Sequence, residues 1–259
     1  MIDNDIRERF PDKQSLVQYA TRLEGKRISD ISNLIGLLDV DSRSRTKAIV
    51  SNVVETHYFG IPTNSYEAPD FPHLGIELKV SPLKYVSSAA LYNCKERNVL
   101  KVMDYHDVFE HPDWREAKLA HKLNKILFVF YIHDNEVPAI EWKIATVFLW
   151  SPSPEETQMI EEDYNIIRNK IIAGERNREG HNTLLGTCPK HAGGYKYQNP
   201  SASVESALRP HPVMKYAEKR GFCLKQDKLI FLIANVLDYK IKQVGRTKGL
   251  PAEAFPGLQ

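Results

Sequence analysis

The stretch that decides the fold reads Pro69-Asp70-Phe71-Pro72-His73-Leu74-Gly75-Ile76-Glu77-Leu78-Lys79-Val80. Its last five residues alternate between apolar and polar side chains, a pattern that predicts a half-buried β-strand. Residues two apart on a strand project from the same face, so Glu77 and Lys79 should point together, away from a core that takes the apolar residues. The six residues between Asp70 and Glu77 leave room for a turn that brings the two carboxylates together.

Two carboxylates and an ammonium group on one strand edge are suited to cutting a phosphodiester. Oxygen ligands are those that Mg²⁺ prefers, and Glu55, on an amphipathic run before the loop, supplies a third carboxylate. A bound metal stabilises charge on the phosphate and lowers the pKa of the attacking water, and Lys79 could orient that water or neutralise the phosphate. The competing interpretation is a surface strand on which Glu77 and Lys79 form a solvated pair.

The spacing Asp-x6-Glu-x-Lys occurs twice in this chain, so it is not specific alone. The second copy consists of Asp134, Glu141 and Lys143. Asp134 stands beside Asn135 in an expected hairpin turn, where Asp is common for conformational reasons. Ordinary charges at the edge of the next strand explain the other two residues, so we favour the first copy as the functional one.

Length, composition and cysteine content indicate an ordinary globular protein. The chain has 259 residues, with 42% hydrophobic and 26% charged residues, enough for one large domain or two small ones. No apolar run reaches the roughly 18 residues that span a bilayer, and the acidic N-terminus does not resemble a secretory signal. Cys94, Cys188 and Cys223 show no metal-binding spacing and suggest a reducing compartment. We therefore expect a cytoplasmic protein.

Charge is distributed unevenly between the two parts of the chain. Residues 164–259 contain 16 Lys and Arg against 7 Asp and Glu, whereas the first 163 residues contain 19 against 26. A basic region beside an acidic one fits a surface that binds a polyanion next to a metal-binding surface. Simple variation in surface charge is an equally good explanation of this split.

Hydrophobic periodicity predicts helices first, then a mixed sheet, then further helices. Strands are expected around Glu77 and over residues 97–104, 126–132 and 144–150, the last two being apolar enough for central strands buried on both faces. Helices are expected over residues 15–23, 28–37, 48–58, 154–173 and 227–240. The Ser-Pro-Glu-Glu sequence at 153–156 has the form of a capping box. The fold class is therefore α/β, with two or three layers.

The segment from Glu55 to Lys79 resembles the MutH family of mismatch-repair nicking endonucleases and the GATC-cutting type II restriction endonucleases related to it. The shared residues are Glu55-Thr56-His57-Tyr58-Phe59-Gly60, Pro69-Asp70-Phe71-Pro72 and Leu74 to Lys79. Further similarity includes His121-Lys122-Leu123, Leu149-Trp150-Ser151-Pro152, Pro189-Lys190 and Arg220-Gly221-Phe222, so the resemblance spans about residues 15–240. It implies a restriction-endonuclease-like core, a central mixed β-sheet flanked by α-helices, in a single endonuclease domain with a catalytic lobe near residues 1–150 and a basic DNA-reading lobe near 151–259.

The resemblance also implies a role for each residue of the site. Asp70 and Glu77 would ligate Mg²⁺, and Glu55 would help to hold a second metal or a metal-bound water. Lys79 would position or deprotonate the attacking water. Lys122, which stands where the family has a further active-site lysine, would stabilise the phosphate or hold Lys79 in place. Cleavage would be an in-line displacement that leaves a 5′-phosphate.

Residues outside this site are candidates for contact with double-stranded DNA, since Lys, Arg, Asn and Gln read base edges and Lys and Arg neutralise phosphates. The loop around residues 188–197 mixes glycines, aromatic residues and lysines and is suited to groove entry, although it could equally touch phosphates alone. Lys47 and Arg220 match family positions that face DNA. The predicted DNA-binding residues are Lys47, Lys190, Tyr195, Lys196, Arg220 and Lys225.

Two functions from the same family compete, and a third belongs to another class. The leading prediction is a site-specific type II restriction endonuclease that reads GATC as a homodimer on a palindromic site. Residues 95–100 resemble the restriction enzymes, and Cys188 and Cys223 replace an arginine and a tyrosine of MutH. The first alternative is a MutH-like strand-nicking enzyme that answers to mismatch-repair partners. The second is a DNA-binding effector domain without catalysis, against which the intact site argues.

Overall fold

The computed structural model describes residues 2–36, 47–62, 67–177, 183–190 and 208–259. The chain forms two compact units, each assembled from separate stretches of sequence. Unit 1 contains residues 1–96, 124–151 and 229–259, and unit 2 contains residues 97–123 and 152–228. From the sequence, two consecutive lobes divided near residue 150 are expected. The observed units interleave because residues 97–123 join the later half of the chain and the last thirty or so residues return to the first.

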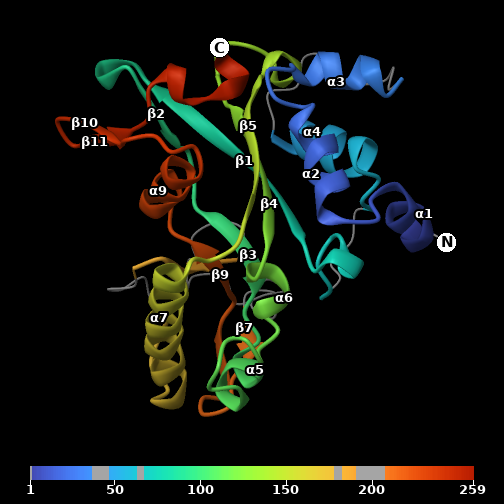
Figure 1. Cartoon of the computed structure of the whole chain (residues 1–259). Helices are drawn as coiled ribbons and strands as arrows, with labels where there is room; N and C mark the ends of the chain where they lie inside the picture. The colour runs from blue at the N-terminus through green and yellow to red at the C-terminus, as the bar shows by residue number, and fades with distance from the viewer. Residues whose placement is uncertain (1, 37–46, 63–66, 178–182, 191–207) are drawn as a thin grey trace, which may run out of the picture. The chain divides into compact units, whose positions relative to one another are not determined.

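A four-stranded mixed sheet forms the centre of unit 1 (Figure 1). Its order is β2 (Leu91–Cys94), β1 (Glu77–Val86), β4 (Ile126–Ile132) and β5 (Ile144–Trp150). β1 and β4 are parallel, whereas the other two pairs are antiparallel. Nearly every residue of β4 and β5 is buried, as expected for continuous apolar runs in central strands. The predicted α/β class with a central mixed sheet is confirmed, and so are the predicted bounds of these two strands.

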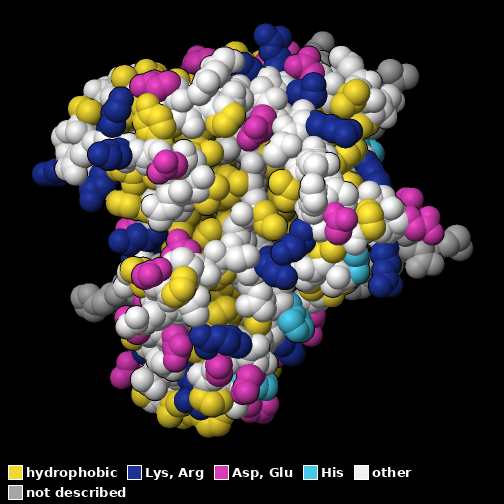
Figure 2. Space-filling model, viewed as in Figure 1, with side chains coloured by type: hydrophobic (Ala, Val, Ile, Leu, Met, Phe, Trp, Pro, Cys, Tyr) yellow, Lys and Arg dark blue, Asp and Glu magenta, His cyan; other side chains and the backbone are white. Residues whose placement is uncertain are grey.

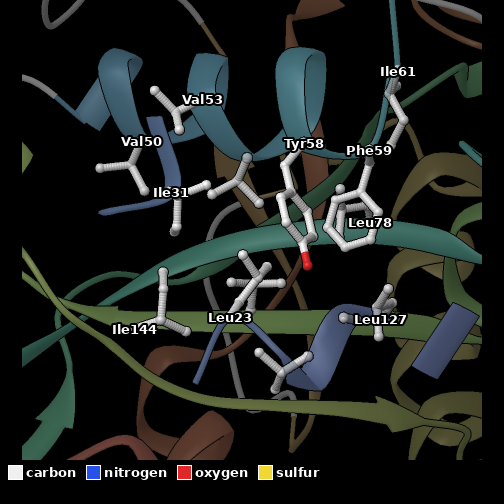
Figure 3. Close-up of a cluster of buried hydrophobic side chains, with 14 of the residues drawn as sticks. Leu23, Ile31, Val50, Val53, Tyr58, Phe59, Ile61, Leu78, Leu127 and Ile144 are labelled. Atoms are coloured by element: carbon white, nitrogen blue, oxygen red, sulfur yellow. The ribbon is translucent and has the colours of Figure 1, made fainter. Parts of the chain in front are cut away.

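Helices gather on one side of this sheet (Figure 1): α1 (Ile2–Arg9), α2 (Lys13–Thr21), α3 (Ile28–Leu34) and α4 (Lys47–Ser51). Figure 3 shows Val50 and Tyr58 extending from their helix toward the strand that carries Leu78, with Leu127 on the neighbouring strand. These side chains are almost fully buried. Burial of these apolar side chains stabilises the packing of the helix that carries Glu55 against the strand that carries Glu77.

The predicted helix over residues 48–58 changes its geometry halfway along. α4 ends at Ser51, and η1 (Asn52–Tyr58) continues as a π-helix in which the Phe59 N–H donates to the Val54 carbonyl, 3.0 Å away. Periodicity could not reveal this change, because a π-turn adds only one residue per hydrogen-bonded ring. Glu55 lies in the widened segment, and such segments occur frequently at functional sites.

The C-terminal part of unit 1 packs against the sheet through close backbone approaches. It contains most of α9 (Gln226–Val236), then β10 (Lys242–Val244), β11 (Thr247–Gly249), η5 (Ala252–Ala254) and η6 (Pro256–Leu258). A Cβ at Gly257 would lie 2.2 Å from the Ile144 carbonyl oxygen, and one at Gly249 would lie 2.4 Å from that of Tyr92. Only glycine fits where two backbones come this close.

Unit 2 contains a separate three-stranded sheet in the order β3 (Asn98–Val102), β9 (Arg220–Leu224) and β6 (Leu185–Pro189). The predicted strand over 97–104 therefore exists but does not belong to the central sheet. The remaining elements are α5 (Tyr105–Glu110), α6 (Ala120–Leu123), α7 (Pro154–Ile172), β7 (Leu208–Pro210) and β8 (Tyr216–Glu218). The long helix α7 begins at the predicted capping box, in which the Ser153 Oγ accepts from Glu156 N at 3.2 Å and Glu156 Oε2 accepts from Ser153 N at 2.9 Å.

The surface of the described residues carries both signs of charge. Figure 2 shows Lys and Arg side chains interspersed with Asp and Glu on the visible face. Part of the basic C-terminal region, residues 191–207, lies outside the described residues. Among the residues that are described, no helix is long and apolar enough to cross a membrane.

Candidate active site

Glu77 and Lys79 stand at the beginning of β1 and pair with each other. Lys79 Nζ lies 2.7 Å from Glu77 Oε1. The backbone of Glu77 is fixed by the bond from its N–H to the Lys125 carbonyl at 3.0 Å, and β1 continues in parallel register along β4. Glu77 is only 3% exposed. The interpretation of a solvated surface pair is therefore wrong for Glu77, since a buried carboxylate needs a cation beside it.

Asp70 returns to the same strand through a tight turn. The N–H of Phe71 donates to the Ile76 carbonyl at 2.8 Å, and Gly75 takes the left-handed conformation (φ 64°) at the end of the one-turn helix η2 (Pro72–Leu74). Asp70 Oδ2 accepts a hydrogen bond from the Leu78 N–H at 2.9 Å. The predicted turn is therefore present. It brings the Asp70 carboxylate to the backbone N–H of Leu78, the residue between Glu77 and Lys79.

Glu55 lies within electrostatic reach of the pair on β1. Burial raises the pKa of Glu55 above its ordinary value, and the negative charge of Glu77 adds to this. The Lys79 ammonium and a hydrogen bond with Ser51 act in the opposite direction. Helix η1 and strand β1 therefore bring two carboxylates and one ammonium into a single electrostatic cluster. Ser51, one turn before Glu55, is a member of the site that sequence reasoning missed, and its i, i+4 spacing was the available signal.

The side chains present are chemically suited to a hard divalent cation. All three carboxylates supply oxygen, the ligand type that Mg²⁺ prefers. Burial is the main cause of the raised pKa of Glu55, and the buried Glu77 adds negative charge beside it, so a bound cation would offset an electrostatic cost at this site. Within the described residues, however, no three His, Cys, Asp or Glu side chains are arranged as ready metal ligands. The carboxylates would therefore have to adjust their side chains to share one ion.

We expect Glu55→Gln to stabilise the metal-free protein near neutral pH. A carboxyl group whose pKa is raised in the folded state binds its proton more tightly there than in the unfolded state. The free energy of unfolding therefore falls as the pH rises from the pKa of the unfolded state to the pKa of the folded state, and it stays lower at higher pH. Removing the charge should raise the free energy of unfolding by on the order of 1 kcal/mol at about pH 7 and leave it unchanged near pH 4. Urea denaturation at both pH values measures this, and equal destabilisation at both would contradict it.

Lys79→Met is expected to lower the free energy of unfolding by about 2 kcal/mol, because Glu77 loses the cation 2.7 Å away while it remains buried. The value is below that for a fully buried pair because the Lys79 side chain is 19% exposed. Urea denaturation of Lys79→Met, of Glu77→Gln and of the double variant gives the coupling free energy between the two side chains. The double variant should recover part of the loss, whereas simple addition of the two effects would argue against the pairing.

Lys122 and Lys47 have clear positions but no demonstrated role. Lys122 belongs to α6 in unit 2, where it is 8% exposed, so its predicted action beside Lys79 stays a prediction. Lys47 is the first residue of α4, and its Nζ lies 2.7 Å from Glu96 Oε1 in an exposed ion pair. Glu96 belongs to the segment that resembles the restriction enzymes. A contact between Lys47 and DNA would compete with this ion pair.

The remaining predicted DNA contacts differ in their surroundings. Lys190 is exposed and Lys225 half-buried, whereas Arg220 is 6% exposed. The Arg220 guanidinium donates to Thr187 Oγ1 at 3.2 Å and lies 3.1 Å from Glu218 Oε2, so the side chain is buried and paired within unit 2. Its predicted contact with phosphate stays a prediction. Tyr195 and Lys196 lie outside the described residues.

The second Asp-x6-Glu-x-Lys copy forms a connection between strands, as expected. Asp134 Oδ1 accepts from the Glu136 N–H at 2.8 Å, and its carbonyl accepts from Trp142 Nε1. Glu141 is exposed and lies 3.4 Å from Arg27. Ordinary turn and surface interactions therefore account for this copy, which makes it a matched control for the first.

A mixed sheet with carboxylates and a lysine at the beginning of one strand is typical of the restriction-endonuclease-like class. The model of the family "DNA mismatch repair enzyme MutH" matches residues 59–163. The chain is also 27% identical to the DNA mismatch repair protein MutH of Shewanella baltica (strain OS185) over 221 residues, 81% of this chain and 89% of the relative. For the protein of the same name from Vibrio cholerae serotype O1 (strain M66-2), identity is 27% over 186 residues, 70% of this chain and 80% of the relative. These matches confirm the resemblance to MutH, and the mixed α/β fold is consistent with a restriction-endonuclease-like core.

Proposed function

We propose that this protein is a Mg²⁺-dependent, MutH-like DNA endonuclease that nicks one strand of double-stranded DNA. The observation that carries the proposal is the buried Glu77–Lys79 pair on β1, with Asp70 bonded to the backbone between them and Glu55 in electrostatic reach. The relatives are mismatch-repair proteins by name, so they favour the nicking function over the restriction function, which is the leading prediction from the sequence. Association with mismatch-repair partners belongs to this proposal.

Each side chain has a task that follows from its surroundings. Asp70, Glu77 and Glu55 would hold the cation, which supplies charge stabilisation at the phosphate and a more acidic water. Lys79, whose side chain is 19% exposed beside Glu77, would position or deprotonate the attacking water or neutralise the phosphate. Glu55, which lies in electrostatic reach of Glu77 and Lys79, would help to hold a second metal or a metal-bound water. Lys122 would stabilise the phosphate.

A second candidate is a GATC-specific restriction endonuclease that acts as a homodimer on a palindromic site. Two features of the sequence favour it. Residues 95–100 resemble the restriction enzymes, and Glu96 of this segment engages the predicted DNA-contacting Lys47. Cys188 and Cys223 also replace residues of MutH in regions that resemble its DNA-contacting loops. Both candidates use the same catalytic residues, so the number of strands cut is the outcome that distinguishes them in a cleavage assay.

The test is incubation of the purified protein with supercoiled unmethylated plasmid and Mg²⁺, followed by gel analysis and sequencing of the cut ends. Open-circular product with 5′-phosphate ends at GATC is the expected result. Linear product that appears without a nicked intermediate would support the restriction function instead. Uncut plasmid at saturating Mg²⁺, with specific DNA binding retained, would contradict both and leave a binding domain without catalysis.

A further inference from the structure

Two of the three cysteines are neighbours on one face of the unit 2 sheet. The antiparallel register of β6 and β9 sets Gly186 opposite Cys223 and Cys188 opposite Gly221. Opposed residues and residues two apart share a face, so the cysteines are diagonal neighbours and each faces a glycine. With no side chain on either glycine, nothing on these two strands separates the thiols. They form a hydrogen bond with each other, and both are free thiols in this structure.

Positive groups surround this cysteine pair. A Cβ at Gly221 would lie 3.0 Å from Lys190 Cγ, and one at Gly186 would lie 3.2 Å from Lys225 Cγ, so a lysine stem packs on the same face beyond each glycine. Arg97 and Arg220 also act electrostatically on both thiols. A cationic environment of this kind stabilises a thiolate, which is the reactive form of cysteine.

The two thiols are made unequal by their surroundings. The hydrogen bond from Cys223, and the charges of Lys190, Arg97 and Arg220, lower the pKa of Cys188 to about 6, although burial opposes them. The same hydrogen bond and burial raise the pKa of Cys223. Cys188 is also 4% exposed, against 1% for Cys223. Cys188 is thus the thiol whose surroundings favour the reactive thiolate, and Cys223 is the thiol held beside it.

Cys94 lies in a very different environment. It is fully buried in unit 1, and burial alone raises the pKa of its thiol. It is therefore an internal reference for an inert cysteine of the same chain.

We propose that Cys188 and Cys223 form a redox-active dithiol, a modification site at which a peroxide joins the two sulfurs in a reversible disulfide. The Cys188 thiolate attacks one oxygen of hydrogen peroxide, the O–O bond breaks, and hydroxide leaves as Cys188 becomes a sulfenic acid. The Cys223 sulfur then attacks the Cys188 sulfur, and the sulfenic oxygen leaves as water with the proton of the Cys223 thiol. The two sulfurs lose two electrons in total, and the peroxide gains them.

The strand geometry makes such a disulfide labile rather than structural. Diagonal neighbours in an antiparallel sheet have Cα atoms about 7–8 Å apart, whereas a relaxed disulfide needs less than about 7 Å. The two strands must draw together by roughly 1 Å, which strains the bond and makes it easy to reduce. A labile bond of this kind suits reversible modification.

The test is timed exposure of the reduced full-length protein to hydrogen peroxide, with free thiols blocked by one isotopic form of iodoacetamide and reduced thiols by another. Mass spectrometry should show a Cys188–Cys223 crosslink that forms at least tenfold faster than any loss of the Cys94 thiol and that dithiothreitol reverses. Cys94→Ser should leave the crosslink unchanged. Cys223→Ser should instead accumulate a sulfenic acid at Cys188, trapped by a cyclic 1,3-diketone.

The proposal fails if Cys188 and Cys223 in the unaltered protein stay as unreactive as Cys94. It also fails if Cys188 oxidises but no crosslink to Cys223 appears. Both outcomes are read from the unaltered chain, so they do not depend on how a variant folds. They are also independent of nuclease activity, which allows this proposal and the proposed function to fail separately.

Discussion

Glu77→Gln is expected to slow Mg²⁺-dependent DNA cleavage by roughly 1000-fold or more, since it removes a negative ligand from a site built to stabilise charge. The amide keeps the volume of the side chain, which is 3% exposed at the beginning of β1. It cannot pair as an ion with Lys79, so the ammonium also loses the partner that holds it 2.7 Å away. Single-turnover cleavage of supercoiled plasmid measures the loss.

Glu141→Gln is the matched control for this experiment. Glu141 also precedes a lysine by two residues and comes just before a strand, but it is exposed and lies 3.4 Å from Arg27. Its replacement should leave the cleavage rate within about twofold, because exposed ion pairs contribute little. Equal loss of cleavage in both variants would show that the assay reports general damage, and retention of cleavage by Glu77→Gln would refute its role as a metal ligand.

Asp163→Ala is expected to destabilise the protein by about 4 kcal/mol, the largest effect on stability that the structure suggests. Asp163 is 1% exposed on α7, and its carboxylate accepts from the backbone N–H groups of Thr183 (2.6 Å), Leu184 (2.6 Å) and Leu185 (2.8 Å). Alanine would leave these donors without the acceptor that they share, in the interior of unit 2. Urea denaturation followed by circular dichroism measures the change.

Glu162→Ala serves as the control for Asp163, because Glu162 is its exposed neighbour on the same helix and accepts from Gln158 Nε2 at 3.0 Å on the helix surface. We expect it to change the free energy of unfolding by no more than about 0.5 kcal/mol. A loss below about 1 kcal/mol for Asp163→Ala would show that the start of β6 does not depend on this carboxylate.

Elements governed by local pattern could be predicted from the sequence. β4 and β5 have the predicted bounds because a nearly continuous run of apolar residues is most stable in the middle of a sheet. Helix α7 begins at the predicted residue because its capping box satisfies donors that any helix leaves unpaired at its N-terminus. In these cases the chemistry that decides the structure lies within a few residues of the chain.

Features that depend on distant partners could not be predicted. β3 pairs with β9, more than a hundred residues later, and no pattern within 97–104 distinguishes that sheet from the central one. Asp163 reads as one of several acidic residues on an amphipathic helix, yet it binds backbone twenty residues further along. The sequence has no local signal for either contact.

The site shows the same division between local and distant contacts. The pairing of Glu77 with Lys79 and the return of Asp70 follow from strand alternation and a short turn, and both are present. The burial of Glu77 could not be foreseen, because alternation assigns it to the solvent face. The role of Lys122 is predicted from resemblance alone. Lys122 belongs to unit 2 and Lys79 to unit 1, so no local sequence pattern could predict whether the two side chains act together.

The most direct test of the active site compares Asp70→Asn with Asp134→Asn in the plasmid cleavage assay, over a range of Mg²⁺ concentrations. The two aspartates have the same spacing to a Glu-x-Lys sequence, but Asp70 Oδ2 accepts from Leu78 N beside Glu77, whereas Asp134 Oδ1 accepts from Glu136 N in a connecting loop. Loss of cleavage by roughly 1000-fold for Asp70→Asn, with unchanged cleavage for Asp134→Asn, is the predicted result. Full cleavage by Asp70→Asn at every Mg²⁺ concentration would contradict the account.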